Sequence, residues 1–170
     1  MNVISNTTVI SNFAAIGQLE VLHALYGRVF ISTDVYAEIQ EGVDEGYAFY
    51  DKVVNTIAPP NAAGWIHLTG LQTEVELRYL GTLPRRLHKG EASCLAIAKA
   101  RHWLLLTDDM AARQEARRLK IKLSGSLGSL VIAIEREFCT LDMANTWLLD
   151  MLQQGYRSPV TDLTPLVQMK

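Results

Sequence analysis

Short apolar runs and amphipathic stretches alternate along most of the chain. Apolar runs bounded by turn residues predict five strands, at 3–5, 29–31, 65–68, 103–107 and 121–124. Apolar residues at helical spacing predict helices over 9–16, 19–25, 33–39, 43–54, 75–80, 91–101, 110–119 and 127–137, and a last helix that Thr140 caps. Strands that alternate with helices are typical of a parallel sheet covered on both faces. The pattern therefore predicts an α/β fold with a central parallel sheet of about five strands.

The length of 170 residues suits one compact domain, or one domain with an appendage. We expect residues 1–138 to form the α/β domain, and residues 139–170 to form a C-terminal helix and tail packed on that domain or extending it. The last helix carries Met143, Trp147 and Met151 on one stripe. Such a stripe is either part of the core or a seam for a second copy or a partner protein.

Composition and charge narrow the classes of function. The chain has 16 Lys and Arg residues against 18 Asp and Glu residues, a formal net charge of −2, so nucleic-acid binding would need a local basic patch. Cys94 and Cys139 are too few for a disulfide scaffold or a four-Cys zinc site, and their apolar helical contexts predict buried free thiols. We see no basic leader segment and no apolar run long enough to cross a membrane. A cytoplasmic protein is therefore the expectation.

Polar residues follow three of the predicted strands, where an α/β protein binds its ligands. Asn6 ends the first strand, Asp108–Asp109 the fourth and Ser124–Ser126 the fifth. Glu91 begins the helix that leads into the fourth strand, and Glu38 lies about one turn into the helix after the second. Because the carboxyl ends of parallel strands share one edge, we expect four carboxylates in one crevice: Glu38, Glu91, Asp108 and Asp109.

Four carboxylates in one crevice repel one another and resist ionisation unless they share a cation. Oxygen ligands of this kind suit the hard ions Mg²⁺ and Mn²⁺, and such ions support phosphoryl chemistry. The four His residues are scattered and form no zinc-binding spacing. The chain also lacks a GxxxxGK loop, a complete GxGxxG motif and an Asp-x-Asp motif after the first strand. These absences weigh against other α/β enzymes and switches.

Five segments, taken in order and with their spacing, resemble PIN-domain proteins of the prokaryotic branch related to VapC-type toxins. They are Asn6–Thr8, Val35–Ile39, His88–Ala92, Leu106–Arg113 and Gly125–Gly128, and Gly155–Arg157 is similar to the C-terminal end of that family. The resemblance implies a three-layer α/β/α sandwich. It also implies cleavage of single-stranded RNA that depends on Mg²⁺ or Mn²⁺, restraint by a cognate antitoxin protein, and a homodimer.

The resemblance also assigns roles to single residues. Glu38 matches the family's acid in the helix after the second strand, and Glu91 matches the acid of its Gly-Glu motif. Asp108 and Asp109 together cover the acid after the fourth strand, and the choice between them stays open. Ser126 matches a small hydroxyl residue that contacts water or metal. The implied catalytic set is Glu38, Glu91, Asp108 and Asp109, and the implied metal ligands are Asn6, Glu91, Asp108 and Asp109.

The chain departs from the family pattern at the end of the first strand, where Asn6 replaces an Asp. Asn offers a metal its carbonyl oxygen but brings no charge and cannot act as a base. A weakened nuclease is one interpretation, and a catalytically inactive PIN-like module that binds a protein is the alternative.

Several candidate residues also have an ordinary structural interpretation. Helix N-termini favour acids such as Glu91, and Asp109 or Ser126 would cap the helix that follows it. Arg113 and Arg117 are spaced to share a helix face that is either solvated or able to hold RNA phosphates beside the acids.

Overall fold

The computed structural model describes residues 1–167, and its centre is a sheet of six parallel strands. The strands lie in the order β3-β4-β2-β1-β5-β6. Their bounds are β1 (Val3–Ser5), β2 (Val29–Ser32), β3 (Ile57–Ala58), β4 (Ile66–Thr69), β5 (Leu104–Leu106) and β6 (Leu123–Ser124). Because β1 lies between β2 and β5, the ends of these strands come together near the middle of one sheet edge.

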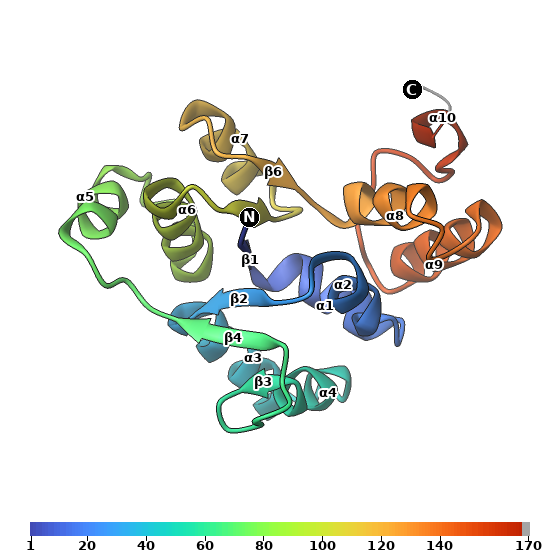
Figure 1. Cartoon of the computed structure of the whole chain (residues 1–170), viewed down its shortest axis with the longest axis horizontal. Coiled ribbons are helices and arrows are strands. Elements are labelled where there is room, and N and C mark those ends of the chain that lie inside the picture. The colour runs from blue at the N-terminus through green and yellow to red at the C-terminus, as the bar shows by residue number, and fades with distance from the viewer. Residues whose placement is uncertain (168–170) are drawn as a thin grey trace.

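Helices connect the strands and cover the sheet. They are α1 (Thr7–Ala15), α2 (Leu19–Tyr26), α3 (Thr33–Asp44), α4 (Phe49–Asn55), α5 (Glu74–Thr82), α6 (Lys89–Arg101), α7 (Met110–Arg118), α8 (Ser126–Glu135), α9 (Leu141–Gln153) and α10 (Thr164–Val167). Figure 1 shows α5 and α6 on one side of the sheet and α1, α2, α8 and α9 on the other. The predicted three-layer α/β/α arrangement is confirmed.

The core lies on both faces of the central strands. Ile4, Ile31 and Leu105 are almost completely buried, as expected for a parallel sheet with helices on each face. Helix α6 packs against α3, α5 and α7 as well as the sheet, and it buries eight residues, among them Cys94. Cys139 is also buried, and both thiols are free, as predicted.

The structure corrects two details of the sequence prediction. The sheet has a sixth strand, β3, whose two residues are too few to carry a pattern. The single helix expected over 43–54 is divided, because α3 continues to Asp44 and α4 begins at Phe49. Gly46 lies between them with a φ of 92°, a conformation that glycine adopts without strain and that ends the first helix.

Helix α9 packs against α8 and α1. Leu148 and Met151 are buried on the packed side of α9, whereas Met143 is exposed and therefore does not belong to the core. The division of the chain at residue 138 stays a prediction. Within residues 1–167, no helix combines the length and the apolar character that crossing a membrane requires.

Candidate functional site

Asn6 joins the ends of β1 and β5. Its side-chain Nδ2 donates a hydrogen bond to Thr107 Oγ1 at 2.7 Å, and its Oδ1 accepts from the backbone N–H and the hydroxyl of Thr8, at 3.2 and 2.7 Å. Asn6 is 2% exposed. It therefore caps α1 and ties two neighbouring strands together, and both ends of its amide are in use.

Asp108 is held on the β6 side of this edge. Its Oδ1 accepts from the Ser126 backbone N–H at 2.8 Å, and its Oδ2 accepts from the Ser126 hydroxyl at 2.5 Å and from Asn12 Nδ2 at 2.9 Å. A Cβ at Gly125 would collide with the Asp108 carboxylate, so only glycine allows this approach. Asp108 and Ser126 are thus brought together, as the sequence predicts.

Asn12 is a member of this network that the sequence reasoning missed. It lies four residues after Thr8, on the same face of α1, and the buried residue Phe13 follows it directly. A polar amide at helical spacing from the cap residues is the signal that could have identified it.

Glu38 connects three elements at the same edge. The Thr7 hydroxyl, at the start of α1, donates to Glu38 Oε2, and the backbone N–H of Gly90 donates to Oε1 at 3.2 Å. A Cβ at Gly90 would overlap the Glu38 carboxylate. Glycine at position 90 therefore leaves room for the Glu38 carboxylate between α3 and the first turn of α6.

Glu91 and Asp109 form the remaining part of the site. Asp109 caps α7, because its Oδ1 accepts from the Ala112 backbone N–H at 2.7 Å. Among residues 1–167, Asp109 Oδ2 accepts no hydrogen bond, so this oxygen is free. Glu91 accepts from the His88 backbone N–H at 3.0 Å through Oε2, and its Oε1 lies 3.3 Å from His88 Nδ1.

The electrostatics of Glu91 distinguish it from the other acids. Burial raises the pKa of Glu91, and the charge of Asp109 raises it further, although the hydrogen bond from the His88 amide works in the opposite direction. In the described part of the chain, no Lys or Arg forms an ion pair with any of the four acids. The negative charge of Glu91 and Asp109, which we call the carboxylate pair, is therefore not neutralised by a Lys or Arg in residues 1–167.

Whether the acids of this site could hold a divalent ion depends on which of their oxygens are free. Within residues 1–167, no three His, Cys, Asp or Glu side chains gather into a group that could hold one metal. Mg²⁺ in proteins commonly uses only one or two carboxylates and completes its shell with water and substrate phosphate. The carboxylate pair, with its free Asp109 oxygen, fits a site of that kind. The larger ligand set of Asn6, Glu91, Asp108 and Asp109 stays a prediction.

The C-terminal tail reaches the same edge. A cavity of about 220 Å³ lies between α1, Asp108–Asp109 and residues 155–157. Tyr156 is half-buried, and burial followed by the charge of Asp108 raises the pKa of its hydroxyl, with Arg113 acting in the opposite direction. The start and the end of the chain therefore contribute to one site.

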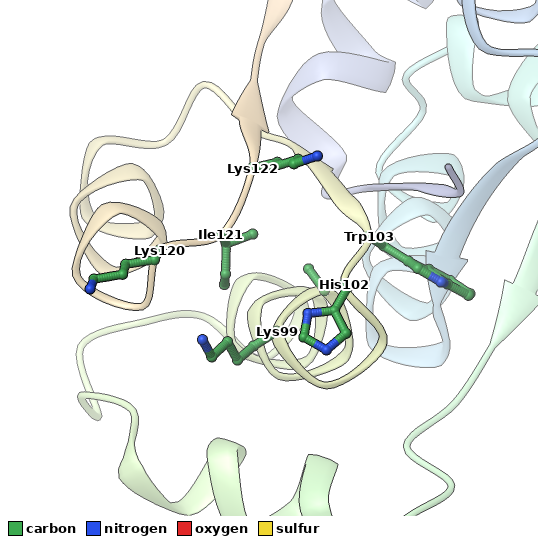
Figure 2. Close-up of a pocket in the computed structure, with 7 residues that line it drawn as sticks. Lys99, His102, Trp103, Lys120, Ile121 and Lys122 are labelled. Atoms are coloured by element: carbon green, nitrogen blue, oxygen red, sulfur yellow. The ribbon is translucent and has the colours of Figure 1, made fainter.

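A second pocket, of about 290 Å³, lies near residues that precede β5 and β6, and so at the opposite edge of the sheet. Three Lys side chains and His102 line it, with no carboxylate. Figure 2 shows Lys120 and Lys122 extending in opposite directions, and Lys99 Nζ is engaged with the Leu119 carbonyl at 2.8 Å. These cations do not converge on one ligand. The candidate site therefore remains the edge of the sheet at which the strands have their carboxyl ends, which we call the carboxyl edge.

Comparison with known proteins places the chain in a family. The sequence model described as DUF3368, a PIN domain, matches residues 2–168. The chain belongs to the PIN-domain family. The resemblance inferred from its sequence motifs is therefore confirmed. PIN domains are typically nucleases and generally depend on a metal ion.

A solved structure supports the fold independently. A PilT N-terminus domain protein of the hyperthermophilic archaeon Sulfolobus solfataricus P2 aligns with a TM-score of 0.53 and 13% identity, over 79% of this PIN domain and 95% of the archaeal chain. At that identity the likeness concerns the fold alone. No curated protein matches the sequence.

Proposed function

We propose that this PIN domain is an endonuclease that uses Mg²⁺ or Mn²⁺ to cleave single-stranded RNA, and that it acts as the toxin of a toxin–antitoxin pair. Family membership supports the general activity. The observation that carries the proposal is the carboxylate pair, Glu91 and Asp109, two acids whose charges interact and which have no Lys or Arg partner in the described residues. The proposed partners are single-stranded RNA, an antitoxin protein and a second copy of the chain.

The proposed division of labour follows from the hydrogen bonds. Glu91 and the free oxygen of Asp109 would hold the ion, which when bound polarises the phosphate and lowers the pKa of a water molecule. Asp108 and Glu38 have their oxygens occupied by Ser126, Asn12, Thr7 and the Gly90 amide, so they position the β6–α8 turn and α6 around the pair. Asn6 fixes the ends of β1 and β5 and carries no charge.

A cleavage assay with a charge-matched control tests this function. Fluorescent single-stranded RNA is incubated with the purified protein in Mn²⁺, Mg²⁺ or EDTA. Glu91→Gln/Asp109→Asn should reduce the metal-dependent rate by about a hundredfold or more, the scale of losing one electrostatic contact to a transition state. Glu45→Gln/Asp51→Asn removes two exposed acids elsewhere and should leave the rate unchanged. Equal rates for both double variants would refute the nuclease proposal.

A catalytically inactive module that binds a protein is the second candidate, and Asn6 favours it. Asn6→Asp separates the two. The fold accommodates this change, because the Thr107 hydroxyl, which accepts from the Asn6 amide, can turn and donate to a carboxylate instead. For a weakened nuclease, Mn²⁺ affinity should rise about tenfold, since one added charge near a divalent ion contributes more than about 1 kcal/mol. Unchanged Mn²⁺ binding and no cleavage by either protein would support the binding module.

A further inference from the structure

A cleft of about 730 Å³ opens beside Asp108 and Asp109. It lies between α7, the turn from β6 into α8, and the C-terminal tail, and we call it the arginine cleft. Its volume is within the range of ligand sites. The residues that carry the argument are Arg113, Arg117, Arg157, Leu127, Tyr156 and Pro159.

The three arginines of the cleft are in different states. Arg113 is half-buried and fixed, because its Nη1 donates to the Thr107 and Ser124 carbonyls at 2.8 and 3.2 Å. Arg117, one helical turn further along α7, and Arg157, on the tail, are exposed. Within residues 1–167, the guanidinium groups of Arg117 and Arg157 make neither an ion pair nor a hydrogen bond. By contrast, Arg118 pairs with Glu115 at 2.6 Å. Two free guanidinium groups therefore border the cleft.

The walls between these cations are partly apolar. Leu127 and Pro159 line the cleft with the ring of Tyr156, and Met110, at the start of α7, is 65% exposed beside them. Single-stranded nucleic acids bind grooves that combine positive groups for the phosphates with aromatic or apolar surfaces for the bases. The arginine cleft has both kinds of surface, and it continues directly into the acidic edge.

We propose that the arginine cleft binds the stretch of single-stranded RNA next to the scissile phosphate, with Arg117 and Arg157 on backbone phosphates and a base against Leu127 and Tyr156. This inference rests on the proposed nuclease function. An acidic peptide would pair with the two arginines, but it would not account for the neighbouring carboxylates. A phosphodiester accounts for both, because a divalent ion bridges phosphate and carboxylate.

The test is a binding measurement under conditions that prevent cleavage. The full chain is titrated into a short fluorescein-labelled single-stranded RNA in EDTA, and anisotropy is read at several salt concentrations. Arg117→Ala/Arg157→Ala should raise Kd about tenfold or more, and the slope of log affinity against log salt should fall by about 1.4 for two phosphate contacts. Arg28→Ala/Arg78→Ala removes two exposed arginines elsewhere and serves as the matched control. Its Kd and slope should stay close to those of the wild type.

The outcomes separate this inference from the proposed function. Equal weakening by the cleft variant and the control variant would overturn the arginine cleft, whatever the cleavage assay gives. A specific loss of binding in the cleft variant, in a protein that never cleaves RNA in Mn²⁺, would keep the cleft and refute the nuclease. Binding of an oligoglutamate peptide through Arg117 and Arg157 by a wild-type chain that does not bind RNA would also overturn the proposal. Circular dichroism confirms that each variant is folded.

Discussion

Glu76 and Glu91 occupy the same local position and have opposite surroundings. Each is the third residue of its helix and completes a capping box with the residue before the helix, Thr73 in one case and His88 in the other. Both are buried, with 1% and 9% of their surface exposed. Arg101 contacts Glu76 at 2.6 Å, whereas Glu91 has an exposed His and the negative charge of Asp109 nearby.

The pKa values of Glu76 and Glu91 are shifted in opposite directions because of these surroundings. Burial alone would raise the pKa of Glu76, but the hydrogen bond from Arg101 and those from the Gln72 and Thr73 amides outweigh burial and hold its pKa below the usual value. The pKa of Glu91 is raised. A capping box therefore forms at both helices, and a distant segment supplies an Arg partner to Glu76 but none to Glu91.

The largest expected effect comes from removing the cation of the structural site. Arg101 also donates to Thr69 Oγ1 and the Gly70 carbonyl, each at 2.8 Å, so it joins the end of β4 to α5 and α6. Arg101→Met should lower the free energy of unfolding by about 3–5 kcal/mol, because it leaves Glu76 buried and charged. Urea unfolding measures this, and Glu76→Gln/Arg101→Met should recover part of the loss. A cost below about 1 kcal/mol for the single variant would show that the two glutamates are not differently stabilised.

Removing the charges of the carboxylate pair should have the opposite effect on stability. Glu91→Gln/Asp109→Asn keeps both helix-capping acceptors, since Gln and Asn retain a carbonyl oxygen, and it removes two charges that repel each other. We expect the free energy of unfolding to stay the same or to rise by up to about 1 kcal/mol, while cleavage is lost. A loss of stability comparable to that of Arg101→Met would make the pair structural.

The smallest expected effect is on the pH dependence of stability. The lowered pKa of Glu76 contributes stability that is complete above its unfolded value, near 4.5, and is lost as pH falls through the folded value. The raised pKa of Glu91 contributes stability that is present below 4.5 and is lost as pH rises through its folded value. Between pH 3 and 6, Glu76→Gln should therefore flatten the rise of stability with pH, and Glu91→Gln should steepen it. Each change is at most about 1.4 kcal/mol per pH unit. Unfolding curves at several pH values that shift in the same direction for both variants would contradict this assignment.

The sequence predicted those features of the site that depend on residues close together in the chain. The strand ends with Asn6, Asp108 and Ser126 were predicted from apolar runs and the residues after them, and a parallel sheet brings such ends together. The sequence could not predict contacts between residues that lie far apart in the chain. The pairing of Glu76 with Arg101 joins residues 25 positions apart across two helices, and no spacing indicates it. Similarly, Asn12 donates to Asp108 Oδ2 although the two residues lie 96 positions apart, and this contact is visible only in the fold.

One wall of the arginine cleft comes from residues 156–159, which follow every other residue of the site in the chain. Since domains begin to fold from the N-terminus while they are being synthesised, the sheet and its acids can form on the ribosome before this wall exists. During translation the growing polypeptide therefore has an open, incomplete cleft, and the wall is complete only once Pro159 has been added.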